Sequence, residues 1–263
     1  MFRHCVAGID FSAGWDRVQS RLRQMVALFD IRELTLVHAD EPHRRAHKDA
    51  NDRTNRKLHL EQVAADMSRE LAITVHTQFV SGFAVSSILD CAKRKQADLI
   101  VVANRSHSRS REFFMGNVAL NLARLCKLPL LIVPSDLGAV ADDAPLLLAT
   151  DNSPASARAR ACFTELVGTD RQGMVMIVRS PEHQVAFEEV QAGESFATDN
   201  PNLDVRTVVG DPVEEICEAA SNVRTPLIIL GKRGTNPIAE LPLGSTAEGI
   251  CRHATNPVLL IPS

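Results

Sequence analysis

Residues 227–234 read LIILGKRG, and residues 244–246, which follow after nine intervening residues, read GST. The apolar run predicts a strand that ends at Gly231, and the second segment predicts the first turn of a helix. Gly231 and Gly234 permit a tight turn in which backbone N–H groups approach an anion. The helix N-terminus adds free N–H groups and two hydroxyls, so the segment is a candidate phosphate loop.

The spacing of this loop matches neither of two common nucleotide-binding motifs. A Walker A loop needs a glycine five residues before Gly231 and a Ser or Thr after Lys232, but the chain has Pro226 and Arg233 there. The Rossmann pattern G-x-G-x-x-G is absent as well. On spacing alone, an ordinary strand-to-helix turn with a helix cap explains the segment equally well. In a phosphate site, Lys232 and Arg233 would add positive charge.

The chain contains one internal repeat, and we refer to its two units as the first and second copies. Residues 81–103 align with residues 209–231 at an offset of 128 positions. The same offset carries residues 128–134 onto residues 256–262. The repeat therefore spans nearly the whole chain and indicates two domains of one type.

The two copies differ in length in their first halves. At their starts the offset is 141, which carries Asp10 onto Asp151, so the first copy holds 13 additional residues (141 minus 128). These residues fall in or near residues 43–69, which are rich in charged side chains. We expect a long, mostly solvated helix there.

Apolar runs without polar alternation recur in both copies, as parallel strands covered on both faces require. They are residues 6–9, 34–37 and 99–102 in the first copy and residues 146–149, 174–178 and 227–230 in the second. Ser153 and Asp211, each followed by proline, predict helix N-caps between strands. Alternating strands and helices predict an α/β fold with an open parallel sheet. The expected linker, residues 135–144, separates domains 1–136 and 137–263.

The glycine loop and its surroundings resemble one family. Residues 231–245 follow the pattern G-2x-G-9x-G-S, which resembles the G-2x-G-9x-G-(S/T) signature of universal stress proteins. Residues 147–153 (LLATDNS) resemble the opening strand of that family and its acidic residue. Residues 210–216 (GDPVEEI) resemble its G-x-P-x-x-x-I segment, and residues 256–262 resemble its closing strand.

The resemblance implies a Rossmann-like fold with five strands in each copy, of the adenine-nucleotide alpha-hydrolase-like type. It also implies dimers joined through the last strand, and ATP binding where the glycine signature is kept. In a tandem chain we therefore expect residues 130–133 and 258–261 to pair edge to edge, as an intramolecular pseudo-dimer. Further self-association into a homodimer stays open, and so does the identity of any protein partner.

The resemblance also assigns a ligand site to the second copy. Asp151 would lie near the adenosine end of the nucleotide, and Arg179 occupies a position that is usually apolar and backs the adenine. Arg179 would either stack on the base or block it. The other expected contacts are Ala149 and Thr150 around the base, Gly231, Arg233 and Gly234 around the phosphates, and Gly244, Ser245 and Thr246 at the helix N-terminus.

The first copy has lost part of the glycine signature. Ala103 and Ser106 stand where the loop glycines belong, and Asn117 replaces the Ser or Thr, although Gly116 and Asp10 remain. Side chains at positions that require positive φ cost about 1 kcal/mol or more each. We therefore expect no tight ATP binding there. Weak anion binding stays open because four nearby residues are cationic or titratable: Arg105, His107, Arg109 and Arg111.

The chain contains no convincing catalytic set. It lacks a G-x-S-x-G elbow and the SGGxDS and HxGH motifs of adenylate-transfer enzymes. We therefore expect a non-catalytic ATP-binding or adenine-nucleotide-binding regulator of the stress response, with or without Mg²⁺. One alternative is a structural interaction module without tight nucleotide binding, and a lesser one is a slow ATP hydrolase. We expect His43 and His47 to lie on a solvated helix face and to bind no metal.

Composition narrows the class of partners. A net charge of −3 over 263 residues argues against nucleic acid and against an anionic membrane surface. The short apolar start is interrupted by Asp10, so we expect neither a secretory signal nor a membrane helix, and a cytoplasmic protein. Six scattered cysteines form no C-x-x-C pair and are expected to be core residues.

Overall fold

The computed structural model of the chain describes residues 1–12, 15–41, 50–104, 116–134, 138, 140–141, 143–179, 201–234 and 243–263. Its first copy runs through β1 (His4–Gly8), α1 (Trp15–Phe29), β2 (Glu33–Asp40), α2 (Ala50–Leu71), β3 (Thr74–Ser81), α3 (Ala84–Arg94), β4 (Leu99–Asn104), α4 (Asn117–Leu125) and β5 (Leu130–Pro134). The second copy runs through β6 (Leu146–Ala149), the 3₁₀ turn η2 (Pro154–Ser156), α5 (Ala157–Val167), β7 (Gly173–Arg179), β8 (Leu203–Val209), α7 (Pro212–Asn222), β9 (Ile228–Gly231), α8 (Ser245–His253) and β10 (Val258–Ile261).

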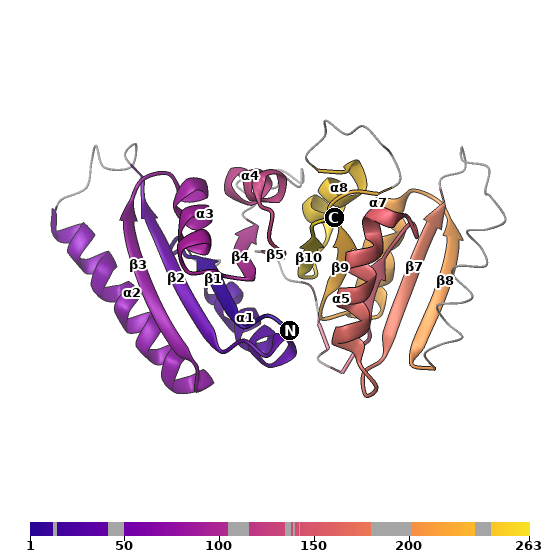
Figure 1. Ribbon diagram of the computed structural model, residues 1–263, viewed down its shortest axis with the longest axis horizontal. Coiled ribbons are helices and arrows are strands. Elements are labelled where there is room, and N and C mark those ends of the chain that lie inside the picture. Colours follow the sequence, from indigo (N-terminus) through magenta and orange to yellow (C-terminus); the bar gives the residue numbers. More distant parts are fainter. Residues whose placement is uncertain are drawn as a thin grey trace.

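The two copies form one ten-stranded sheet in the order β3-β2-β1-β4-β5-β10-β9-β6-β7-β8 (Figure 1). Every neighbouring pair is parallel except β5 and β10, which pair antiparallel at the centre. Leu131 lies opposite Leu259 there, and the two residues are related by the offset of 128. The expected α/β class and the edge-to-edge pairing of the closing strands are therefore confirmed.

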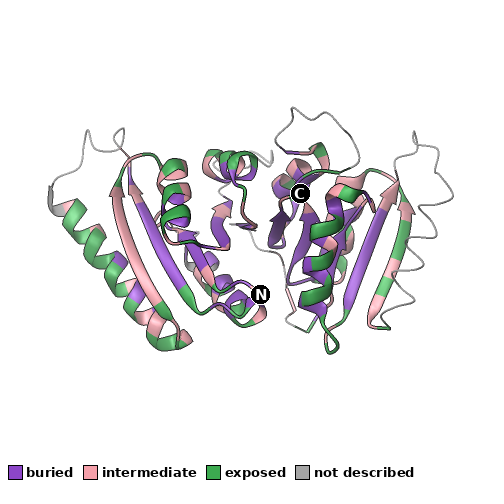
Figure 2. Ribbon diagram, in the orientation of Figure 1, coloured by how far each residue is buried: buried purple, intermediate pink, exposed green. Residues whose placement is uncertain are grey.

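Helices cover both faces of the sheet and create two apolar cores. One core packs α1, α2 and α5 against the sheet, and the other packs α3, α4, α7 and α8. Figure 2 shows the strands near the middle of the sheet as largely buried, while α2 is exposed along much of its length. Five of the cysteines are buried, Cys217 is partly buried, and all six are free thiols, as expected of core cysteines.

Sequence signals for helix starts had mixed outcomes. Asp211 caps α7 as predicted, because its Oδ1 accepts the N–H groups of Val213 and Glu214 at 2.9 and 3.0 Å. Ser153 precedes η2 rather than an α-helix, and its hydroxyl caps nothing. The predicted long helix is present as α2, but its expected beginning, with His43 and His47, lies outside the described residues. No helix in the described ranges is long and apolar enough to cross a membrane.

Polar contacts join the copies where α4 and α8 flank the central pair of strands. Glu248 on α8 contacts Arg124 of the other copy at 3.1 Å and Arg252 on its own helix at 2.6 Å. The hydrogen bond from Arg252 and the contact with Arg124 hold the pKa of Glu248 below its ordinary value. Asn104 at the end of β4 donates to the carbonyl oxygen of Cys251 at 2.9 Å. The two halves therefore share more than a pair of strands.

Candidate functional site

Asp151 stands just beyond the carboxyl end of β6, the edge at which open α/β sheets bind ligands. Its Oδ1 accepts hydrogen bonds from the backbone N–H and the hydroxyl of Ser153, at 3.0 and 2.7 Å. The hydroxyl of Ser153 is thus oriented toward the Asp151 carboxylate, and it makes no helix-capping hydrogen bond. The carboxylate is thereby fixed in one orientation.

The glycine loop approaches Asp151 from the neighbouring strand β9. A β-carbon added at Gly234 would overlap Oδ2 of Asp151. A β-carbon at Gly231 would lie 3.0 Å from the carbonyl oxygen of Arg233 and 3.6 Å from that of Ala155. Gly231 therefore allows close packing of backbone against the segment that follows β6, and Gly234 leaves room for the carboxylate of Asp151.

The far end of the loop returns to the same place. The N–H of Gly244 donates to the carbonyl oxygen of Lys232 at 2.9 Å, and Gly244 is the N-cap residue of α8. No side chain in the described ranges caps this helix, whose first N–H groups have no helical acceptor. Asp151, Gly231, Gly234 and the N-terminus of α8 therefore converge.

The remaining predicted residues occupy different environments. Ala149 and Thr150 are buried, and the Thr150 Oγ1 is 3.0 Å from the Ser156 Oγ, inside the turn. Arg233 and Ser245 are exposed, and Thr246 is partly buried on the first turn of α8. The hydroxyl of Thr150 is thus part of the protein scaffold, while Arg233 and Ser245 are accessible.

Arg179 lies on the other face of the sheet from this constellation. Along β7, Val175 and Ile177 pack in the core with α5, whereas Met176 and Val178 pack in the core with α7 and α8. Alternation along a strand places Arg179 with the first group. Its Nε is buried without a hydrogen-bond partner in the part of the chain that the structure describes. By position, Val178 is the residue of β7 that faces the convergence.

Lys232 also turns away from the loop to which it belongs. Its side chain is buried, and its Nζ donates to the carbonyl oxygen of Cys126, at the end of α4 in the first copy. Burial lowers the pKa of Lys232 below its ordinary value. The expectation that Lys232 adds positive charge to a phosphate site is therefore wrong. Its side chain instead links the two copies.

The first copy has a cleft of about 340 Å³ at the equivalent place. The sheet registers relate the copies, because Ala7 pairs with Val101 as Leu148 pairs with Ile229. The cleft is lined by Gly8, Ile9, Asp10, Ala103, Gly116, Asn117 and Val118, among others. Their equivalents are Ala149, Thr150, Asp151, Gly231, Gly244, Ser245 and Thr246. These seven residues of the second copy therefore occupy the positions that line one cleft in the first copy.

The equivalent of Arg179 behaves differently from these residues. Sheet register makes Asp40 its counterpart, since Asp40 pairs with Ser81 as Arg179 pairs with Val209. Asp40 is 3% exposed and bonded to Arg56 of α2 at 3.1 Å, away from the cleft lining. The position of Asp40 in the first copy thus supports the conclusion that Arg179 faces away from the site.

The N–H of Gly116 already has an acceptor in the first copy, as that of the equivalent Gly244 has in the second. The N–H of Gly116 donates to the Oδ1 of Asn104 at 2.9 Å, and the same side chain bonds Cys251 of the other copy. Ala103 lines the cleft in place of a glycine. Ser106, Arg105, His107, Arg109 and Arg111 lie outside the described residues.

A buried histidine closes the first copy on the side of α2. His38 is 6% exposed, with ring centroids 4.7 Å from Phe11 and 5.1 Å from Phe79. Its Nδ1 donates to the carbonyl oxygen of Ile9 at 2.9 Å. Burial is the main cause that lowers the pKa of His38 below 6.5; Arg56 acts in the same direction, and Asp40 and Asp10 oppose it.

Replacing His38 by isoleucine, the residue that the second copy has as Ile177, should reduce the sensitivity of the fold to mild acid. A folded-state pKa below the unfolded value means that the unfolded chain binds the proton more readily. Stability associated with neutral His38 is therefore present above about pH 6.5 and lost as the pH falls through the lowered pKa. Urea unfolding near neutral pH and near pH 5 measures this loss. An equal loss in the His38→Ile variant would contradict it.

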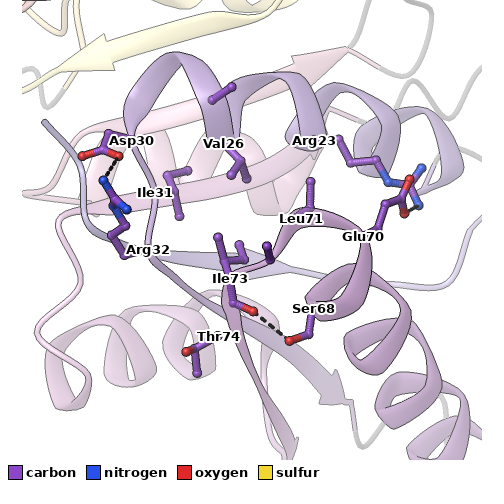
Figure 3. A pocket seen from close by; sticks show the side chains of 12 residues that line it. Arg23, Val26, Asp30, Ile31, Arg32, Ser68, Glu70, Leu71, Ile73 and Thr74 are labelled. Atoms are coloured by element: carbon purple, nitrogen blue, oxygen red, sulfur yellow. Dashed lines mark hydrogen bonds and ion pairs between the residues drawn. The ribbon is translucent and has the colours of Figure 1, made fainter.

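A larger hollow, of about 730 Å³, lies at the opposite ends of the strands, between the ends of α1 and α2 (Figure 3). Two ion pairs line it, Arg23 with Glu70 at 2.8 Å and Arg32 with Asp30 at 2.6 Å. Both pairs are substantially exposed, and such pairs contribute little. The hollow is remote from the glycine loop and from both aspartates, so the candidate site is the other edge of the sheet.

Comparison with known proteins agrees with this architecture. The model of the universal stress protein family matches residues 1–134 and 168–262. The chain belongs to the universal stress protein family. A universal stress protein of Mycobacterium bovis is 24% identical over 225 residues, which cover 78% of this chain and 73% of the relative.

Solved structures resemble this universal stress protein over nearly its whole length. A universal stress protein from Archaeoglobus fulgidus has a TM-score of 0.76 at 17% identity, with 98% of this chain and 96% of the other covered. A protein of unknown function from Pseudomonas aeruginosa has a TM-score of 0.73 at 15% identity, with coverage of 99% and 93%. At these identities the likeness shows the fold, and the tandem arrangement is shared.

Sequence reasoning about this universal stress protein missed three features of the site. Val178 was overlooked in favour of Arg179, although counting alternation from Met176 identifies it. The contacts of the Asn104 side chain with Gly116 and Cys251 were missed because no sequence motif indicates them. The contacts of Ser156 with Thr150 and Arg160 have no motif either, and they require the folded turn.

Proposed function

We propose that the chain is a non-catalytic, ATP-binding regulator of the stress response whose nucleotide is bound by the second copy. The observation that carries the proposal is the contact between Gly234 and the Asp151 carboxylate, where any side chain at position 234 would intrude. Glycine is required where backbone must approach a ligand and its neighbours closely. This approach brings a carboxylate, a bare loop and a helix N-terminus to one strand edge.

The chemistry of these groups suits a nucleotide. The carboxylate of Asp151 would accept hydrogen bonds from ribose hydroxyls, and the N–H groups at the start of α8 would bind phosphate oxygens. Arg233, which is exposed, would add a charge-assisted contact to the phosphates. ATP, with or without Mg²⁺, is the ligand that we propose.

Regulation would follow from the position of Lys232. The residue belongs to the glycine loop, and its side chain bonds Cys126 of the first copy. A loop that shifts when ATP binds would therefore disturb the contact between copies and alter the surface that a protein partner meets. We propose no chemical step, so any ATP turnover would be slow.

The first test identifies the small molecule carried by the purified chain. We expect mass spectrometry of the denatured protein to release an adenine nucleotide, and calorimetry on the nucleotide-free protein to detect ATP binding with and without Mg²⁺. Asp151→Asn should weaken that binding by roughly tenfold or more, because a neutral amide forms weaker hydrogen bonds with the ribose hydroxyls than the carboxylate does. Asp10→Asn, the matched change in the first copy, should leave it unaltered.

Two other results would favour the alternatives. Absence of ATP binding in the intact chain would overturn the proposal and favour a structural interaction module. Steady-state ATP turnover that Asp151→Ala abolishes would favour a hydrolase.

A further inference from the structure

The turn that carries Asp151 is held by an arginine of the following helix. Nη1 of Arg160, on α5, donates to the carbonyl oxygen of Ser153 at 3.1 Å and to the hydroxyl of Ser156 at 2.8 Å. Ser153 and Ser156 are 7% and 3% exposed, so both acceptors belong to nearly buried residues. Hydrogen bonds from a charged donor are about twice as strong as neutral ones. The contact therefore fixes the turn more firmly than a neutral side chain would.

The bonds continue from Ser156 to the base of the turn. The Ser156 hydroxyl donates to the Ser153 carbonyl oxygen at 2.9 Å and lies 3.0 Å from the Thr150 hydroxyl. The Thr150 oxygen accepts the N–H of Asn152 at 3.0 Å. The guanidinium of Arg160 is thus connected, through Ser156, to the hydroxyl of Thr150 on the other side of Asp151.

This turn is also the support of the glycine loop. A β-carbon at Gly231 would lie 3.6 Å from both the Ala155 carbonyl oxygen and the Ser156 Cα, and one at Gly234 would overlap Asp151. A displacement of the turn would therefore move the carboxylate and one wall of the loop together.

At its described residues the first copy repeats backbone features of this turn without the network. Phe11 and Asn152 are equivalent and both have left-handed backbone, with φ of 53° and 57°. The offset of 141 replaces Thr150 by Ile9, Ser156 by Trp15 and Arg160 by Gln19. The network is therefore not needed to form the turn.

The orientation of the serine differs between copies. In the first copy the Ser12 hydroxyl is buried without a hydrogen-bond partner among the described residues, and the N–H of Ser12 alone contacts Asp10 Oδ1, at 2.9 Å. In the second copy both groups of Ser153 contact Asp151 Oδ1. The network thus accompanies a serine whose N–H and hydroxyl both donate to the carboxylate.

We infer that Arg160 is a positioning residue of the nucleotide site, which acts through Ser153 and Ser156 to hold Asp151 against the glycine loop. This inference rests on the function proposed above for the ligand, whereas the positioning itself concerns the unliganded chain. Arg160 touches no ligand in this scheme, and its effect on binding is indirect.

The first experiment measures the turn in the intact, nucleotide-free protein. In Arg160→Met we expect NMR hydrogen exchange at the amides of Asn152 and Ser153 to accelerate about tenfold, because their acceptors lose support. The amide of Thr150, which donates to the Met176 carbonyl oxygen in the sheet, is the internal control. Arg160→Lys should restore slow exchange, and Gln19→Met should change nothing. Unchanged exchange at Asn152 and Ser153 in Arg160→Met would overturn the inference whether or not ATP binds.

The second experiment is a double-mutant cycle on the dissociation constant for ATP. Arg160→Met should weaken binding about tenfold, and Arg160→Lys should recover most of the loss. In an Asp151→Asn background, Arg160→Met should have little further effect, because its route through the carboxylate is gone. Additive losses would contradict positioning through Asp151. A wild-type chain that binds no ATP would overturn the proposed function and leave the exchange result to decide the role of Arg160.

Discussion

Gly234→Val should abolish detectable ATP binding by the intact chain, with a loss of at least about 100-fold in affinity, or about 2.7 kcal/mol. The first carbon of the valine side chain would overlap Oδ2 of Asp151, whose other oxygen is bound by both donors of Ser153. Either the aspartate or the loop must therefore move to accommodate the valine. Calorimetric titration with ATP measures the effect.

The control for this change lies in the other half of the repeat. Ser106 is the sequence equivalent of Gly234, and Ser106→Val should leave ATP affinity within about twofold of the wild type. Gly234 is exposed, so Gly234→Val should also leave the thermal midpoint close to the wild-type value. If a folded Gly234→Val protein bound ATP with wild-type affinity, the glycine loop would not be part of the ATP site.

Leu131→Asp should destabilise the chain by about 4 kcal/mol or more, enough to unfold many domains. Leu131 has no exposed surface and lies opposite Leu259 where the two copies meet. A carboxylate there would lose its hydration without an ionic partner on either strand. Urea unfolding followed by the fluorescence of Trp15, the single tryptophan, reports on the first copy, and circular dichroism reports on the whole chain.

A surface leucine provides the comparison for this prediction. Leu58 on α2 is 58% exposed, and Leu58→Asp should change the free energy of unfolding by no more than about 0.5 kcal/mol. Near-equal effects of the two substitutions would mean that the central strands are not packed as described. Loss of the Trp15 transition with retained helix signal would mean that the first copy depends on its partner for stability.

The architecture was predictable because its determinants are local and repeated. Apolar runs such as residues 99–102 and 227–230 occur twice at constant spacing, and parallel strands covered by helices on both faces bury such runs. The pairing of β5 with β10 followed from the family resemblance. Within the site, Asp151, Gly231, Gly234 and Gly244 converge in the structure as the motif implied.

Side-chain directions were less accessible from the sequence. Lys232 reads as loop charge until the fold places Cys126, more than a hundred residues away in the chain, beside it. Arg179 belongs to the opposite face because side chains alternate along β7, and the packing of Val175 and Ile177 shows which face that is. The role of Arg160 depends on a turn that brings its helix over Ser153, and no spacing rule describes that contact.

The antiparallel meeting of β5 and β10 has a consequence for how such a protein changes over time. In a homodimer built on that seam, every inherited substitution is present twice, so a damaged loop is damaged in both halves. When the two halves are fused into one polypeptide, a substitution in one half leaves the other half unchanged. One half of this chain has Ala103 and Ser106 where the other has Gly231 and Gly234, so each folded molecule presents two unequal loops.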